Sequence, residues 1–168
     1  RRRREAAVAR ARQYGQKWID DVADALQFRI EGRTMHEGVP TIVVSFTPKP
    51  RTRPSTREGR MAQRFVGTLW IHEAAAEVTH VEANSIGSVS FGFGLLARLG
   101  KGTEATLTRE LVERDLWMPA QFTLKGKGRV AIFRRLVLDF VVDWFDYYRL
   151  EDDLVMPFPN ARVQSQPG

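Results

Sequence analysis

The sequence predicts a mainly β domain, an antiparallel sheet with an N-terminal amphipathic helix packed on it. Residues 129–150 form the longest nearly uninterrupted apolar and aromatic run of the chain. Several shorter runs before it alternate apolar and polar residues with the period of two that is typical of strands. Only the N-terminal segment carries a helical period over many residues. Helix first and strands afterwards therefore indicate a single sheet with a helical cover.

The run from Arg129 to Leu150 is expected to be one long strand. Seven of the nine even-numbered positions from 130 to 146 are apolar, whereas the odd positions carry Arg135, Asp139 and Asp143. A helix also fits, because these three charged residues lie four apart and would form one polar stripe. The abundance of Val, Ile, Phe, Trp and Tyr favours the strand. Alternation fails at Arg134, where we allow for a bend.

The N-terminal helix is expected over Arg4–Leu26. Apolar residues recur there every three or four positions: Val8, Ala11, Gly15, Trp18, Val22 and Leu26. This spacing places them on one stripe that faces the sheet. We interpret Trp18 as an anchor on the sheet.

A hairpin follows the helix. Gln27–Gly32 and Thr41–Thr47 both alternate, and a turn-like segment at 36–38 lies between them. The basic, proline-rich stretch Pro48–Pro54 then ends the second strand, because proline cannot donate to a sheet. Ser55–Glu58 matches a capping box, which predicts a short helix through Phe65.

Further strands are expected at Gly67–Ile71, Val78–Ser85, Thr103–Glu113 and Leu116–Leu124. Residues 88–99 are apolar and glycine-rich, and Lys125–Gly128 is interpreted as the link to the last strand. Residues 1–150 are thus expected to form one domain, with a helix over 1–26 and a sheet over 27–150. Residues 151–168 form a C-terminal tail, either docked through its apolar residues or mobile.

Composition limits the classes of function. The chain has 168 residues, no cysteine and a formal net charge of +6 that is concentrated in residues 1–12 and 49–64. Disulfides and thiolate metal sites are therefore excluded. No uncharged apolar run reaches transmembrane length. The chain shows no signal peptide and opens on what resembles the interior of a helix, so we expect residues before it in the whole protein.

No catalytic constellation emerges from the motifs. Gly92–Ala97 matches G-x-G-x-x-A, but strands follow strands here, and a dinucleotide site needs alternating strands and helices. His72 and His80 could approach across a hairpin with Glu77 or Glu82 nearby, although surface histidines are the simpler interpretation. The basic loop from Lys49 to Arg60 lacks the interleaved aromatic residues of a specific nucleic-acid site. We therefore expect no enzymatic activity, cofactor, metal or specific nucleic-acid partner.

The order of several short motifs is informative. They are TIVVSFTP (41–48), TREG (56–59), GTLWI (67–71), VTHVEA (78–83), VSFGFGLLARLGKG (89–102), LWMP (116–119) and WFDYYRL (144–150). In this order they resemble uncharacterised bacterial exported proteins similar to the outer-membrane lipoprotein-sorting (LolA/LolB-like) superfamily. The resemblance implies a strongly curved half-barrel whose concave face binds acyl chains, and a periplasmic or otherwise exported location. His72 departs from it, because the usual residue there is Asp, and the N-terminal part of such proteins is missing here.

The leading hypothesis is non-catalytic binding or carriage of a lipid, an acyl chain or a lipoprotein in an apolar cavity of the cell envelope. The alternative is an envelope scaffold module that has a closed core and binds a protein partner. The expected lining residues of the cavity are Trp18, Phe28, Ile30, Ile42, Val44, Phe46, Leu69, Ile71, Phe91, Phe93, Leu107, Phe122, Leu138, Phe140 and Trp144.

Overall fold

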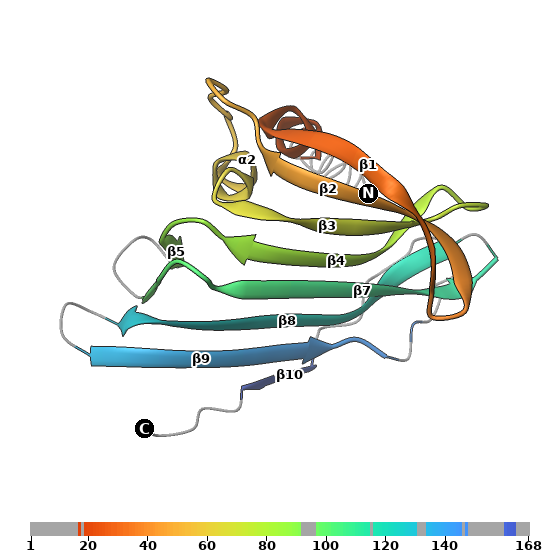
Figure 1. The fold of residues 1–168 in the computed structure, drawn as a ribbon. Coiled ribbons are helices and arrows are strands. Elements are labelled where there is room, and N and C mark those ends of the chain that lie inside the picture. Colours follow the sequence, from red (N-terminus) through yellow and green to blue (C-terminus); the bar gives the residue numbers. More distant parts are fainter. Residues whose placement is uncertain are drawn as a thin grey trace, which may run out of the picture.

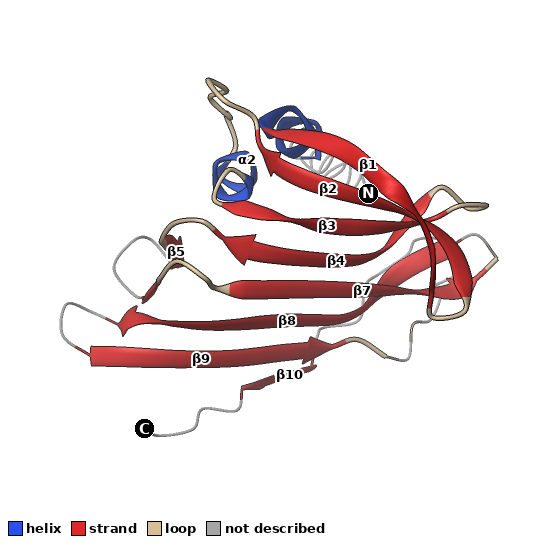
Figure 2. Cartoon of the chain, viewed as in Figure 1, coloured by secondary structure: helices blue, strands red, loops and turns tan. Residues whose placement is uncertain are grey.

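The described residues form an open antiparallel sheet of ten strands with short helical segments near one end (Figures 1 and 2). This computed structural model describes residues 17, 19–91, 97–114, 116–130, 134–145, 147 and 160–163. The prediction of a mainly antiparallel β fold is confirmed. Residues 19–25 are helical, and the rest of the expected N-terminal helix, including Trp18, lies outside the described residues.

The strands are β1 (Leu26–His36), β2 (Val39–Pro48), β3 (Phe65–His72), β4 (Glu77–Ser85), β5 (Val89–Phe91), β6 (Ala97–Leu99), β7 (Glu104–Glu113), β8 (Leu116–Val130), β9 (Arg134–Asp143) and β10 (Asn160–Val163). A six-residue helix, α2 (Arg57–Ala62), lies between β2 and β3. Each strand predicted from residue 27 to residue 124 is present, most of them longer than expected.

The topology is a meander from β1 to β4 and from β7 to β10, and it is interrupted by the β5–β6 hairpin, because β4 pairs with β7 and not with β5. β8 pairs with β7 and β6 along one side and with β9 along the other. The β5–β6 hairpin lies next to the ends of β4 and β7, after a short interruption of the two strands. At this interruption the Ser85 amide donates to the Thr103 carbonyl oxygen, and the Gly102 amide donates to the Ser85 carbonyl oxygen. The sheet is therefore one continuous surface that runs from β1 to β10.

The prediction of one long strand over Arg129–Leu150 is wrong in its extent. Val130 pairs directly with Arg134, so the chain reverses direction between them, and Arg129 and Val130 belong to β8. The supposed link Lys125–Gly128 lies inside β8. Its glycines are required there by close approach, since a Cβ at Gly128 would lie 2.1 Å from the Arg98 carbonyl oxygen. The alternation predicted for the second half is present after Arg134, which is exposed, since the even positions from 136 to 142 are more buried than most odd ones.

The junction between the N-terminal helical segment and α2 is built around Asp21. Its carboxylate accepts hydrogen bonds from the backbone amides and hydroxyl groups of Ser55 and Thr56. The Thr56 hydroxyl, followed by the Thr56 amide, lowers the pKa of Asp21 from 3.8 to about 2. A short helix is present as expected, but it ends at Ala62, and Phe65, through which it was predicted to run, is the first residue of β3. Its N-cap is Thr56 and not Ser55, because the Thr56 hydroxyl accepts from the Gly59 amide at 3.0 Å.

Candidate ligand-binding face

Cross-strand register defines two faces of the sheet, because directly opposite residues place their side chains on the same face. Two continuous rows cross seven strands on one face: Phe28–Phe46–Gly67–Ala83–Ala105–Leu124–Phe140 and Ile30–Val44–Leu69–Val81–Leu107–Phe122–Val142. Neither row contains a polar side chain. We call this the apolar face.

The row between these two lies on the opposite face and is mostly polar. It reads Arg29–Ser45–Thr68–Glu82–Thr106–Thr123–Val141. We call this side the polar face. The sheet is thus amphipathic across β1 to β9, the pattern of a sheet with one face against apolar material and the other against water.

Most of the predicted lining residues share the apolar face. Eight of them lie in its two rows: Phe28, Ile30, Val44, Phe46, Leu69, Leu107, Phe122 and Phe140. Ile42 and Ile71 pair in the next row, and Leu138 lies two residues from Phe140 on β9. Trp144 is half-buried just beyond β9. Phe91 lies in β5 without a described side chain, and Trp18 and Phe93 lie outside the described residues.

Burial varies across the apolar face. Val44, Phe46, Leu124 and Val142 are buried and form part of the packed core. Leu69, Leu107, Phe122, Leu138 and Phe140 are only half-buried. At the β1 end of the rows, Phe28 is 49% exposed and Ile30 is 72% exposed. A fully closed core would bury these side chains, so this face keeps apolar surface available for contact.

Aromatic rings give the face its local shape. The rings of Phe122 and Phe140 meet edge to face with centroids 6.5 Å apart, which is a favourable arrangement. Phe46 lies across Gly67, where a Cβ would be 2.7 Å from its ring and 2.0 Å from the Glu82 carbonyl oxygen. The glycine is therefore needed for the Phe46 ring to cover β3.

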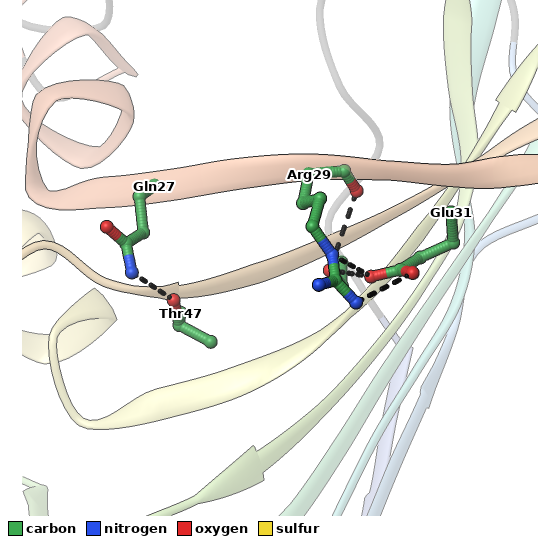
Figure 3. A network of polar contacts seen from close by, with 5 residues as sticks. Gln27, Arg29, Glu31 and Thr47 are labelled. Carbon is green, nitrogen blue, oxygen red and sulfur yellow. Dashed lines mark hydrogen bonds and ion pairs between the residues drawn. The ribbon is translucent and has the colours of Figure 1, made fainter.

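On the polar face, hydrogen bonds between side chains connect β1 to β2 (Figure 3). The Gln27 amide donates to the Thr47 hydroxyl at 2.9 Å, and the Arg29 guanidinium makes two hydrogen bonds of 3.0 Å to Glu31. The Ser45 hydroxyl also donates to Glu31. Arg29 first, and Ser45 second, hold the pKa of the Glu31 carboxyl below its ordinary value.

A cluster of rings on the sheet was missed by sequence analysis. His36 stacks on Trp70 at 5.2 Å between centroids and lies 5.0 Å from the ring of His80. His80 also contacts the Thr108 hydroxyl at 3.1 Å and Glu82 at 3.3 Å. His36 Nε2 is buried and has no hydrogen-bond partner. The cluster depends on β1 reaching over β3 and β4, which no local sequence pattern reports.

The suggested approach of His72 to His80 is not what the structure shows. His72 lies beside Trp117, with ring centroids 5.5 Å apart, and its Nδ1 accepts from the Ala75 amide. His80 instead neighbours His36 and Trp70. Across the described ranges, no three or more His, Cys, Asp or Glu side chains are placed to hold a metal ion.

Arg109 joins three strands at the far end of the meander. Its guanidinium donates to Glu77 and to the Val78 carbonyl oxygen, both at 2.9 Å, and to the Trp117 carbonyl oxygen at 2.8 Å. The Tyr147 hydroxyl donates to the nearby Pro119 carbonyl oxygen, and burial, with Glu110 second, raises the pKa of Tyr147. These contacts connect β4, β7 and β8 and stabilise the sheet.

Comparison with protein-family models, curated proteins and solved structures gave no match. In the part of the chain that the structure describes, no helix has the length and apolar character needed to cross a membrane.

Proposed function

We propose that this protein is a non-catalytic carrier that binds an acyl chain, or the acyl groups of a lipid or lipoprotein, on the apolar face of the sheet. In this proposal the sheet is a half-barrel of the lipoprotein-sorting type, and the protein works in the periplasm or another exported location. The observation that carries the proposal is the pair of apolar rows across seven strands.

The chemistry of the face suits an aliphatic ligand. Its two rows offer Leu, Val, Ile and Phe side chains without a charged or hydrogen-bonding group, so they favour methylene groups over polar ligands. The half-buried residues of β8 and β9, such as Phe122 and Leu138, retain surface that a chain can cover. Each methylene group that leaves water contributes about 0.8 kcal/mol.

Displacement of a fluorescent fatty-acid probe tests this proposal with two matched variants. Leu138→Gln changes the apolar face, whereas Val137→Gln makes a comparable change at the next residue, which is 63% exposed on the other face. If a chain covers about 50 Å² of Leu138, the contact contributes about 1.3 kcal/mol, or roughly a factor of ten in affinity. We expect Leu138→Gln to lose about that factor and Val137→Gln to bind like the wild type.

Thermal unfolding should show that both variants are folded. Equal binding by the two folded variants, or no binding of the probe by the wild type, would contradict the carrier proposal. The scaffold alternative, in which the apolar face only forms a core for a protein-binding module, would then be favoured.

A further inference from the structure

A row of arginines crosses the polar face near the end of β8 and the start of β9. Arg98 on β6 pairs directly with Arg129 on β8, and Arg129 pairs directly with Arg135 on β9. The three side chains therefore stand on neighbouring strands, on one face, at spacings of about 5 Å between Cβ atoms. All three residues are exposed. We call them the arginine row.

A fourth arginine joins the row through Ser88. The Arg98 guanidinium donates to the Ser88 hydroxyl at 2.8 and 3.0 Å. Arg64 donates to the Ser88 carbonyl oxygen at 3.4 Å, so two guanidinium groups meet at one residue. Lys127 adds a further positive charge two residues from Arg129 on the same face of β8.

The row is electrostatically unfavourable for the fold itself, because like charges directly opposite each other destabilise a sheet. Between described residues, the arginine ion pairs lie elsewhere, at Arg29–Glu31, Arg33–Glu73 and Arg109–Glu77. Neither Arg129 nor Arg135 forms an ion pair with a described carboxylate. Planar guanidinium groups without a carboxylate partner are suited to phosphate groups, which they bind in a bidentate manner.

We propose that the arginine row is a docking site for the phosphate headgroups of an anionic lipid bilayer. At the end of the β8–β9 pair, the polar face carries Lys127, Arg129 and Arg135, and the half-buried Leu136 and Leu138 lie on the other face. A basic face opposite an apolar face is the arrangement of elements that lie in a membrane interface. The inference goes beyond acyl-chain binding and does not rest on it.

A nucleic-acid partner fits the row less well. Its described neighbours on the polar face are Ser88, Ser90, Lys127 and Val137, none of which offers a ring for base stacking. Binding to an anionic bilayer needs no aromatic stacking, because each basic side chain near the negatively charged surface adds its own electrostatic attraction. Phosphate chemistry is common to both partners, so the test includes both.

The experiment is sedimentation of the full chain with vesicles at near-physiological salt. Vesicles of phosphatidylcholine alone are compared with vesicles of equal parts phosphatidylcholine and phosphatidylglycerol. The test variant is Arg129→Thr with Arg135→Thr, and the control is Arg53→Thr with Arg57→Thr, both within the basic loop from Lys49 to Arg60. Both pairs lower the formal net charge of +6 by the same amount.

We expect binding to the anionic vesicles only. Loss of the two arginines of the row should weaken it by about 30-fold, which corresponds to about 1 kcal/mol for each residue. The control pair should change it by less than about threefold, because its arginines lie outside the contact. Arg129→Lys with Arg135→Lys should bind more tightly than the threonine pair and less tightly than the wild type, since the charge is kept and the bidentate geometry is lost.

Three results would overturn the proposal. They are no binding to anionic vesicles, equal loss in the test and control pairs, and displacement of the vesicles by a short DNA duplex that binds more tightly than they do. The thermal midpoint of the test variant should equal or exceed that of the wild type, because repulsion is removed. Binding of the fatty-acid probe by Arg129→Thr with Arg135→Thr should equal that of the wild type, because both arginines lie on the polar face, and this separates a failure of this inference from a failure of the carrier proposal.

Discussion

Replacement of Gly67 by alanine tests how the apolar face is assembled. Gly67 lies opposite Phe46 on β2 and Ala83 on β4, in the middle of one apolar row. A Cβ at this position would lie 2.0 Å from the Glu82 carbonyl oxygen and 2.7 Å from the Phe46 ring. Both distances are far below van der Waals contact, so either the backbone of β4 or the ring must move. Aromatic cover over a strand glycine is a recognised device for holding register.

We expect Gly67→Ala to destabilise the protein by about 1–3 kcal/mol, the usual range for overpacking in a close-packed region. A loss of about 2 kcal/mol lowers the thermal midpoint of a domain of this size by roughly 4–8 °C. Urea unfolding followed by tryptophan fluorescence measures the change, and the slope of the transition should stay constant.

Gly87→Ala is the matched control. A Cβ there would meet only the Arg64 side chain at 3.5 Å or more, which is ordinary contact. Its unfolding midpoint should therefore stay close to that of the wild type. If Gly67→Ala unfolds at the same urea concentration as the wild type and as Gly87→Ala, the close approach of Phe46 to β3 is not a feature of the folded protein.

Three further perturbations follow from the structure. Asp21 has a pKa lowered from 3.8 to about 2, so its contribution to stability is present above about pH 4 and is lost as the pH falls toward 2. As the pH falls from about 4 to about 2, the urea midpoint of Asp21→Asn should therefore fall less than that of the wild type, and an equal fall in both proteins would contradict this. Arg109→Met leaves two carbonyl oxygens without their donor and should lower the free energy of unfolding by about 1–3 kcal/mol, whereas an unchanged urea midpoint would show that the contacts are not formed. Phe46→Ala should lower the free energy of unfolding by about 3–5 kcal/mol, because the Phe46 side chain is only 6% exposed, whereas Phe28→Ala in the same row should lower it far less, because Phe28 is 49% exposed. Similar thermal midpoints for the two variants would refute this difference in burial.

The strands could be predicted from the sequence because their alternation is local. Gln27–Gly32 and Thr41–Thr47 each show period two, and both lie inside observed strands. The same patterns also placed Phe46, Leu69 and Leu107 together on one face, since a half-buried strand has only two sides.

The register and the ends of the strands were harder to predict from the sequence, because they depend on pairing partners that are distant in the sequence. Gly126 and Gly128 resemble a linker, although they lie within β8, where the Thr103 side chain comes close to Gly126 and the backbone of Arg98 and Leu99 comes close to Gly128. The reversal before Arg134 has no proline or Asn-Gly signal to mark it. The arginine row could not be foreseen at all, because Arg98 and Arg129 become neighbours only when β6 pairs with β8.

Acyl-chain binding on the apolar face is the central claim, and a chain-length series measures it most directly. Saturated fatty acids of increasing length compete with a fluorescent probe for the wild-type protein, and Leu138→Gln provides the comparison. If methylene groups are buried on the face, each one should tighten binding by a factor that approaches about four, the equivalent of 0.8 kcal/mol. We predict such a rise for the wild type, with weaker binding at every chain length for Leu138→Gln. An affinity that does not change with chain length would contradict it.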